Sequence, residues 1–339
     1  MTSHPVTHRV FGAGLIGGYV AGALLDRSQA VSVVARPHVR TKLEDGLLLT
    51  DLDGHRTRVP PPRFAAQIAP ESEPRPDYLW LTVKCTGVAK AVPDLASHVG
   101  PGTTILCCQN GLGSETPVKA AFPGNIVLRG MVAFNVAELA PDHLHRGSGG
   151  SVIIEDHPAV ADLAAAVSSG LRPVELSAEM DAVLWAKLQL NLINAINALS
   201  DVPVREMLGH RGYRQVYAAC MRELLAVTAA LGIALPRLTA LPPRWIPRLL
   251  AQPDWLFTQI AKSMLEVDPT VRTSMWWDIS QGKPTEIDYL NGEVVAAGRS
   301  MGAPTPVNER IVRLIKAAEA SHASPALSPE RLLEETGLG

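Results

Sequence analysis

The sequence predicts an α/β fold with two domains, an N-terminal Rossmann-type domain and a C-terminal all-helical domain. A glycine-rich turn near the N-terminus lies between a short apolar strand and an apolar helix, which is how a parallel βαβ unit begins. Strand-like and helix-like segments then alternate, and only helical patterns follow Ser177. We therefore expect domains over residues 1–177 and 178–322, followed by a polar, peripheral tail at 323–339.

Length and composition agree with this organisation. A chain of 339 residues exceeds what one core usually covers, and its 47% apolar and 19% charged residues suit a folded protein. A net charge of −2 gives no reason to expect nucleic acid or an anionic membrane as a partner. The four cysteines form no C-x-x-C pair, and we find neither a signal pattern nor a membrane-spanning apolar run. These features predict a cytoplasmic protein.

The first motif is a dinucleotide-binding fingerprint. Residues 8–11 (HRVF) predict a buried strand, and a helix is expected directly after the glycines. Gly12 permits the tight turn, Gly14 lets the backbone approach a pyrophosphate, and Gly17 lets the helix pack on the strand. The helix N-terminus adds N–H groups and a positive dipole. We predict that the cofactor is bound by Gly12, Ala13, Gly14, Leu15, Ile16 and Gly17.

The end of the second predicted strand, residues 31–35, indicates which dinucleotide binds. A site that prefers NAD usually has an acidic residue here, whereas this chain has Arg36. A guanidinium can bind a 2′-phosphate and stack on adenine, so NADPH/NADP⁺ is the predicted cofactor. The alternative is a solvated surface arginine.

Two further strands, at residues 78–83 and 103–108, end next to polar side chains. Lys84 follows the first, and Asn110 closely follows the second. Because ligands bind beyond the carboxyl ends of parallel strands, we expect both residues at the cofactor edge. A turn-forming Asn-Gly pair is the alternative for Asn110. The other elements expected in this domain are strands at 47–49, 57–59, 126–135, 151–154 and 172–176, a loop at 60–76, and helices at 88–98 and 158–169.

His143 and His145 are expected in a hairpin loop. Two histidines at this spacing can bind a metal, but no cysteine or carboxylate cluster accompanies them in the sequence. We predict a solvated loop and no metal site.

The second domain begins with a helix expected at residues 185–199. Lys187, Asn191 and Asn194 fall on one face of it, so one amine and two amides point the same way. The alternative is a surface helix with a solvated polar stripe. Further helices are expected at 213–231, 255–267, 285–301 and 307–319, and a helix or a turn at 273–281. The Pro- and Trp-rich segment 235–253 is not assigned.

The remaining motifs are TSMWWD at 273–278 and GKPTEIDYLNG at 282–292. Together with GAGLIGG, VK at 83–84, QNG at 109–111 and W-x-K-L-x-x-N at 185–191, they resemble the ketopantoate reductase (2-dehydropantoate 2-reductase) family. The resemblance runs from about residue 8 to about residue 319. It implies NADPH-dependent reduction of a 2-oxo acid, in that family ketopantoate to (R)-pantoate on the route to pantothenate and coenzyme A.

The resemblance also implies roles for individual residues. Lys187 corresponds to the general acid, and Glu286 to the carboxylate that holds the hydroxyl end of the substrate. Lys84 matches a lysine near the nicotinamide, and Glu286 is also expected to contact the cofactor. The expected substrate-binding residues are Asn110, Asn191, Asn194, Ser274 and Asp278, and Asn110 is expected to contact the cofactor too.

Elementary chemistry supports the role of the lysine. Hydride attack on a ketone builds negative charge on oxygen, so a nearby donor must deliver a proton. Lys187 can do so if desolvation or a nearby cation, such as Lys84, lowers the pKa of its amine. Structural alternatives exist for the other groups: Glu286 as a helix cap, Asp278 in an ion pair with Arg272 or Lys283, and Ser274 as an N-cap.

Two departures from the family pattern leave the substrate open. Gly87 stands where many members have glutamine, and Ala195 stands where asparagine is frequent. One alternative is therefore a reductase of another branched or aromatic 2-oxo acid, with a wider pocket built from Trp245, Trp255, Trp276 and Trp277. Others are an NADPH-sensing module without catalysis and an opine-type dehydrogenase. A homodimer through the helical half is also an expectation.

Overall fold

The computed structural model describes residues 6–169, 171–261 and 270–339. The chain divides into two compact units, Met1–Met180 and Asp181–Gly339. The first unit is mixed α/β and the second is helical, which confirms the predicted fold class.

The described part of the first unit contains an eight-stranded sheet. Neighbouring strands pair in parallel, except that β8 and β11 are antiparallel. The chain leaves β1 towards β2 on one side and later returns to β6 on the other side, so the strand order changes direction beside β1. In spatial order the strands are β12 (Val174–Ser177), β11 (Val152–Glu155), β8 (Val127–Val132), β7 (Thr104–Cys107), β6 (Tyr78–Leu81), β1 (Thr7–Phe11), β2 (Ala30–Val34) and β5 (Arg63–Phe64).

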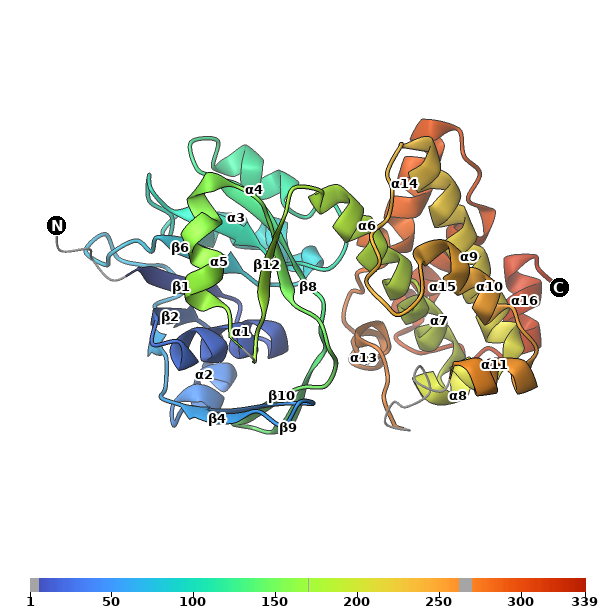
Figure 1. Cartoon of the computed structure of the whole chain (residues 1–339), viewed down its shortest axis with the longest axis horizontal. Coiled ribbons are helices and arrows are strands. Elements are labelled where there is room, and N and C mark those ends of the chain that lie inside the picture. The colour runs from blue at the N-terminus through green and yellow to red at the C-terminus, as the bar shows by residue number, and fades with distance from the viewer. Residues whose placement is uncertain (1–5, 170, 262–269) are drawn as a thin grey trace. The chain divides into compact units, whose positions relative to one another are not determined.

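Helices cover both faces of this sheet. One face packs against α1 (Leu15–Asp26) and α5 (Ala161–Val167), and the other against α3 (Cys85–Leu95) and α4 (Thr116–Ala121) (Figure 1). Burial on both faces explains why β6 (YLWL) reads as a continuous apolar run rather than as an alternating strand.

A second, four-stranded sheet packs against the outer side of α1. Its spatial order is β4 (Arg56–Val59), β3 (Leu47–Asp51), β10 (His143–Arg146) and β9 (Val136–Ala140). A Cβ atom on Gly22 would lie 2.9 Å from the Leu49 side chain, so a small residue is needed where the helix meets β3. The antiparallel pairing of β3 with β4 confirms the predicted strand pair.

The prediction that His143 and His145 lie in a loop is wrong. They belong to β10, which forms a hairpin with β9, the strand before it, and pairs in parallel with β3, which lies far away in the sequence. Both rings hydrogen-bond the Thr50 hydroxyl, at 2.8 Å each.

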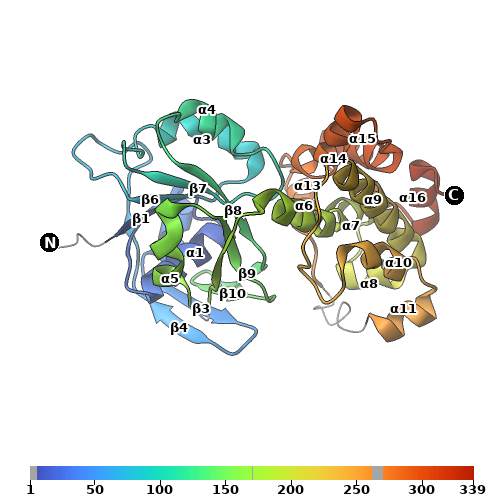
Figure 2. The same ribbon diagram turned by 45° about the horizontal axis from the view of Figure 1, so that its top comes forward.

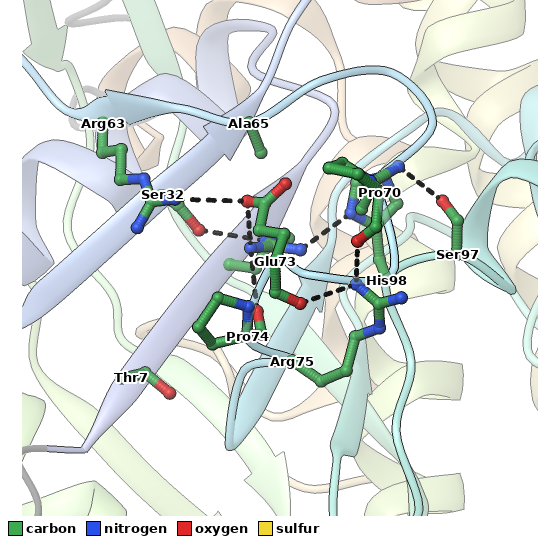
Figure 3. Close-up of polar contacts among 12 residues, drawn as sticks. Thr7, Ser32, Arg63, Ala65, Pro70, Glu73, Pro74, Arg75, Ser97 and His98 are labelled. Carbon is green, nitrogen blue, oxygen red and sulfur yellow. Dashed lines mark hydrogen bonds and ion pairs between the residues drawn. The ribbon is translucent and has the colours of Figure 1, made fainter.

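The predicted loop at 60–76 contains only the two-residue strand β5 and is fastened to the sheet by a buried polar cluster (Figure 3). The Arg9 guanidinium, from β1, donates to Glu73 at 2.7 Å and contacts His98 Nδ1 at 2.9 Å. His98 Nε2 lies 3.0 Å from the Gln67 carbonyl oxygen. Removing one member would leave a buried charge without its partner, which is costly. The cluster therefore holds the loop against the sheet on the side covered by α3.

Three helices in this unit differ from expectation. Helix α3 begins at Cys85 instead of residue 88, which makes Lys84 its N-cap residue. Helices α2 (Pro37–Leu43) and α4 were not predicted, because each is short and buries a single side chain. A helix this short carries too few apolar positions to show periodicity.

In the described residues of the second unit, the 20-residue helix α9 contacts most of the others (Figure 2). The predicted helices at 213–231, 273–281 and 307–319 are confirmed by α9, α13 and α15. No helix in the described ranges is both long and apolar enough to cross a membrane. The helices are α6 (Met180–Asn191), α7 (Ile193–Ser200), α8 (Val204–Gly209), α9 (Arg211–Ala230), α10 (Ile246–Leu250), α11 (Asp254–Ile260), α13 (Ser274–Ser280), α14 (Asn291–Met301), α15 (Pro306–Ser321) and α16 (Pro329–Thr336).

Three further segments of this unit contain helices or 3₁₀ turns. The helix expected at 255–267 is described only as α11, and residues 262–267 lie outside the described residues. The helix expected at 285–301 is instead a 3₁₀ turn, η3 (Ile287–Tyr289), followed by α14, because Leu290 has non-helical angles (φ −112, ψ −101). The unassigned segment 235–253 contains a 3₁₀ turn, Pro243–Trp245, and α10.

The tail expected to be peripheral contains α16, which packs on α9. Leu332 is fully buried, and the Tyr213 hydroxyl donates to the Leu327 carbonyl at 2.7 Å. The segment looks polar in sequence because only one stripe of this helix is apolar.

Candidate active site

The glycine-rich turn has the geometry that its sequence predicts. Gly12 has φ +100, and a Cβ there would lie 2.9 Å from the backbone nitrogen of Val83. A Cβ on Gly17 would lie 2.3 Å from the Gly12 carbonyl oxygen, so only glycine allows α1 to pack this closely on the turn. At Gly14, by contrast, no atom lies within 4 Å of the added Cβ. The chain therefore leaves open space at the one glycine expected to face a pyrophosphate.

The first turn of α1 suits an anionic ligand. The helix begins at Leu15, so the N–H groups of Leu15, Ile16 and Gly17 have no carbonyl partner earlier in the helix. No acidic side chain lies in this turn to compete for them. With Ala13 in the loop before it, the segment presents backbone donors and a positive helix end to a phosphate. The residues present thus fit a dinucleotide.

The carboxyl ends of β1, β6 and β7 form one edge. Phe11, Leu81 and Cys107 are in register, and Lys84 and Asn110 each follow their strand by three residues, both exposed. The structure thus brings these two predicted residues to the sheet edge that carries the glycine turn.

Side-chain hydrogen bonds hold these strand ends together. The Thr82 hydroxyl donates to the Gly12 carbonyl at 2.7 Å, and the Cys85 thiol donates to the Asn110 carbonyl. The buried Gln109 amide donates to the Leu81 carbonyl at 2.6 Å. Sequence reasoning missed Thr82 because a threonine at a strand end carries no signal of its own.

Two arginines follow β2, and only one is available. The Arg40 guanidinium donates to the carbonyls of Ala35 and Ala65 and lies over the Phe64 ring at 5.6 Å. Arg36, the N-cap residue of α2, is exposed, and its side chain has no partner among the described residues. Arg36 can therefore meet a phosphate without breaking an existing interaction.

In the second unit, the helix predicted at 185–199 is interrupted. Helix α6 ends at Asn191 and α7 begins at Ile193, with Leu192 between them in α-helical geometry (φ −58, ψ −19). The Leu192 N–H still donates to the Leu188 carbonyl at 3.1 Å, so the chain direction continues. Lys187, Asn191 and Asn194 are all half-buried. Their common face survives the interruption.

Lys187 is the residue with the most altered chemistry in this helix pair. Burial lowers the pKa of Lys187 to about 8. A lysine in that range holds its proton near neutral pH and releases it more readily than a solvated amine. This is the behaviour required of a general acid that also stabilises a developing oxyanion.

Helix α13 is fastened to α7 next to Asn194. The Thr273 N–H donates to Asn197 Oδ1 at 2.9 Å, and the Thr273 hydroxyl donates to the Asn194 carbonyl at 3.2 Å. Ser274, the first residue of α13, is therefore held beside α7 and is exposed. Thr273 occupies the N-cap position, so the alternative role of Ser274 as an N-cap is wrong. Asn197 is fully buried and structural.

Asp278 lies one turn after Ser274 and is buried. The two cations considered as its ion-pair partners bind elsewhere. Arg272 pairs with Asp201 at 3.1 Å, and Lys283 donates to the Gln281 side chain at 2.5 Å. Asp278 is therefore a buried carboxyl group, not a surface one, one turn from Ser274.

Glu286 is also buried, at the N-cap position of η3, but its side chain does not cap that turn. The Thr285 hydroxyl accepts from the Ile287 N–H instead, at 3.2 Å. The prediction of Glu286 as a helix cap is therefore wrong.

Helix α15 holds the backbone on both sides of Glu286. Glu319 accepts from the Thr285 N–H at 2.7 Å, and Lys316 pairs with Asp288 at 2.6 Å and with Glu319 at 3.3 Å. Burial alone would raise the pKa of Glu319, but the hydrogen bonds from Thr285 and Lys316 lower it. Sequence reasoning missed these contacts because α15 and the segment at Thr285–Asp288 are far apart in the sequence.

One group in the described residues has the donor types of a metal site. Ligand atoms of Asp51, Asp53 and His55 lie within 4.8 Å of one another. The Arg146 guanidinium, however, lies 2.8 Å from Asp51 and 2.9 Å from Asp53. A positive group already neutralises these carboxylates, so the cluster is an ion-pair network of the small sheet.

Comparison with known proteins places both halves of the chain in one family. Residues 9–159 match the family model described as ketopantoate reductase PanE/ApbA, and residues 179–319 match that of its C-terminal domain. A 2-dehydropantoate 2-reductase of Pyrobaculum aerophilum is 30% identical over 72% of this chain and 77% of its own length.

Solved structures agree. A PanE/ApbA family ketopantoate reductase from Ralstonia eutropha has a TM-score of 0.77 at 26% identity, covering 94% of this chain and 99% of its own. A D-mandelate dehydrogenase, solved with NADH and anilino(oxo)acetate, has the same TM-score at 21% identity over 94% of this chain and 99% of its own, and so shares the fold. Because the family models account for residues in both units, this oxidoreductase chain belongs to the ketopantoate reductase PanE/ApbA family, whose cofactor is NADPH.

Proposed function

We propose that the chain reduces a 2-oxo acid with NADPH, and that its substrate is 2-dehydropantoate (ketopantoate), giving (R)-pantoate for pantothenate and coenzyme A biosynthesis. The observation that carries this proposal is Lys187, a desolvated amine with a pKa of about 8 on the face that also bears Asn191 and Asn194. Relatives named 2-dehydropantoate 2-reductase support the choice of substrate.

Most of the proposed cofactor-binding residues lie at the carboxyl edge of the large sheet, and Glu286 belongs to the second unit. Residues 12–17 would hold the pyrophosphate, and Arg36 would bind the 2′-phosphate of NADPH. Lys84, Asn110 and Glu286 are the further residues we assign to the cofactor. Bound NADPH would supply the hydride.

The chain's own residues supply the proton and the orientation. Lys187 donates a hydrogen bond to the substrate carbonyl and transfers its proton as negative charge develops on that oxygen. Asn191 and Asn194 orient the oxo acid from the same helix pair, and Asn110 adds an amide. Ser274 and Asp278 contribute from α13, and the Glu286 carboxylate accepts a hydrogen bond from the substrate hydroxyl group.

The direct test is to follow the transferred hydrogen. NADPH carrying deuterium at the reactive face of C4 should give pantoate with deuterium on C2, detected by mass spectrometry, and chiral chromatography should show the (R) product. Deuterium-free pantoate, or consumption of NADPH without pantoate, would contradict the proposal. If cofactor binds and no 2-oxo acid reacts, the alternative of an NADPH-sensing module takes its place.

The brace on α15 gives a prediction about substrate binding. Glu319→Ala removes the acceptor for the Thr285 N–H, so Glu286 loses its fixed position, and we expect KM for the oxo acid to rise about tenfold. Glu319→Gln keeps an acceptor oxygen and should restore most of the affinity. Steady-state kinetics measure both variants.

Glu309→Ala is the matched control, since it removes an exposed carboxylate from the same helix. Equal KM values for Glu319→Ala and Glu309→Ala would show that the brace does not position Glu286.

A further inference from the structure

Helix α13 carries an exposed aromatic side chain between two predicted substrate-binding residues. Trp277 is three residues after Ser274, so these two side chains are neighbours on the surface of the helix, whereas the next residue, Asp278, is buried. Its side chain is not buried in a core, because 52% of the residue is exposed. An indole in this position is available to a ligand that contacts Ser274.

A second tryptophan holds Trp277 in place. The Trp276 ring meets that of Trp277 edge-to-face, with centroids 4.8 Å apart and an interplanar angle of 84°. Trp276 is itself fixed, since its indole N–H donates to Asp201 at 2.6 Å and the Arg272 guanidinium lies over its ring at 4.2 Å. Asp201 directly follows α7, so this support connects α13 to the helix that carries Asn194.

The two indoles therefore differ in which of their groups can still contact a ligand. The N–H and one ring face of Trp276 already contact other residues of the protein. The N–H of Trp277 has no acceptor among the described residues, and its ring packs edge-to-face with that of Trp276. A rigid aromatic surface of this kind gives contact area at a low cost in side-chain entropy.

From this geometry we infer that Trp277 is a specificity-determining residue that packs against the branched or aromatic group next to the substrate carbonyl. The inference rests on the proposed function and names its substrate class, 2-oxo acids with a bulky apolar group at that carbon. The predicted substrate-binding side chains of this unit are polar, and Trp277 adds the apolar surface that they lack. Ketopantoate, whose carbon beside the carbonyl carries two methyl groups, belongs to the class, as does phenylglyoxylate.

The test compares substrates that differ only in this group. We would measure kcat/KM for pyruvate, ketopantoate, 3-methyl-2-oxobutanoate and phenylglyoxylate with the unaltered chain and with Trp277→Ala. The substitution should lower kcat/KM for the three bulky substrates by about tenfold to a hundredfold and leave that for pyruvate nearly unchanged. Trp277→Phe, which keeps an aromatic face, should retain most of the preference.

Met301→Ala is the control, because Met301 is an exposed apolar residue at the end of α14, at 42%, and belongs to no predicted site. It should leave all four values unchanged. Equal losses for pyruvate and the bulky acids in Trp277→Ala, or unchanged values for all of them, would overturn the inference while leaving the reductase activity established. Failure of the unaltered chain to reduce any of the four acids would instead contradict the proposed function.

Discussion

Replacing Lys187 by alanine is expected to lower kcat for ketopantoate by about two to four orders of magnitude, the usual effect of losing a general acid. The lost group is the proton donor to the carbonyl oxygen, so the damage should fall on the chemical step. Affinity for NADPH should change little, because Lys187 belongs to α6 and not to the glycine turn or its sheet edge. Stopped-flow measurement of hydride transfer and fluorescence titration of NADPH check the two halves of this prediction.

The pH dependence should identify the same group. The protonated amine is the donor, so kcat/KM should be maintained below the pKa of about 8 and decline as pH rises through it. Lys187→Ala should lose this alkaline limb, whereas Lys90→Ala, which removes an exposed lysine on α3, should keep it. A turnover number close to that of the unaltered chain in Lys187→Ala would remove Lys187 from the mechanism.

Arg36→Ala should weaken NADPH binding far more than NADH binding. A charge-assisted contact to a phosphate contributes about 1.5–3 kcal/mol, which corresponds to a loss of roughly tenfold to 150-fold in affinity for NADPH. NADH lacks the 2′-phosphate, so its dissociation constant should hardly change. Isothermal titration calorimetry with both cofactors measures the difference.

Arg40 provides the internal control for this prediction. Its guanidinium is already engaged by the Ala35 and Ala65 carbonyls and by the Phe64 ring. Arg40→Ala should therefore lower the free energy of unfolding and affect the two cofactors equally. If Arg36→Ala also weakened both cofactors equally, Arg36 would not be the residue that recognises the phosphate.

The parts of the fold that sequence predicts well are those with strong local signals. The first βαβ unit can be predicted because Gly12 and Gly17 lie where any larger side chain would collide with the turn, which requires glycine at both positions. Long helices such as α9 and α15 carry enough apolar positions to show their period. The position of Lys84 and Asn110 at the carboxyl ends of their strands could be predicted, because ligands of parallel sheets bind beyond those ends.

What sequence could not predict depends on contacts between distant segments. Strand β10, which was predicted as a loop, has the distant strand β3 as a partner besides its hairpin neighbour β9. The break at Leu192 and the non-helical Leu290 are single-residue departures inside otherwise helical patterns. Helix α16 looks peripheral until its apolar stripe meets α9.

The candidate site divides in the same way. Residue type and spacing alone led to the prediction that Lys187, Asn191 and Asn194 share one face, and this remains a prediction. The support for Glu286 could not be predicted, because Glu319 is 34 residues from the Thr285 N–H that it binds. The fastening of α13 through Asn197 was also missed, since a buried amide in a helix gives no sign of what it will hold.

The most direct test of the central claim is the initial rate of NADPH oxidation with ketopantoate, measured beside a panel of other 2-oxo acids at equal concentration. We predict that ketopantoate is turned over efficiently, at least as well as any panel member, and that the rate vanishes without an oxo acid. Tight NADPH binding with little turnover of ketopantoate would contradict the proposed substrate and transfer the function to the best acid of the panel.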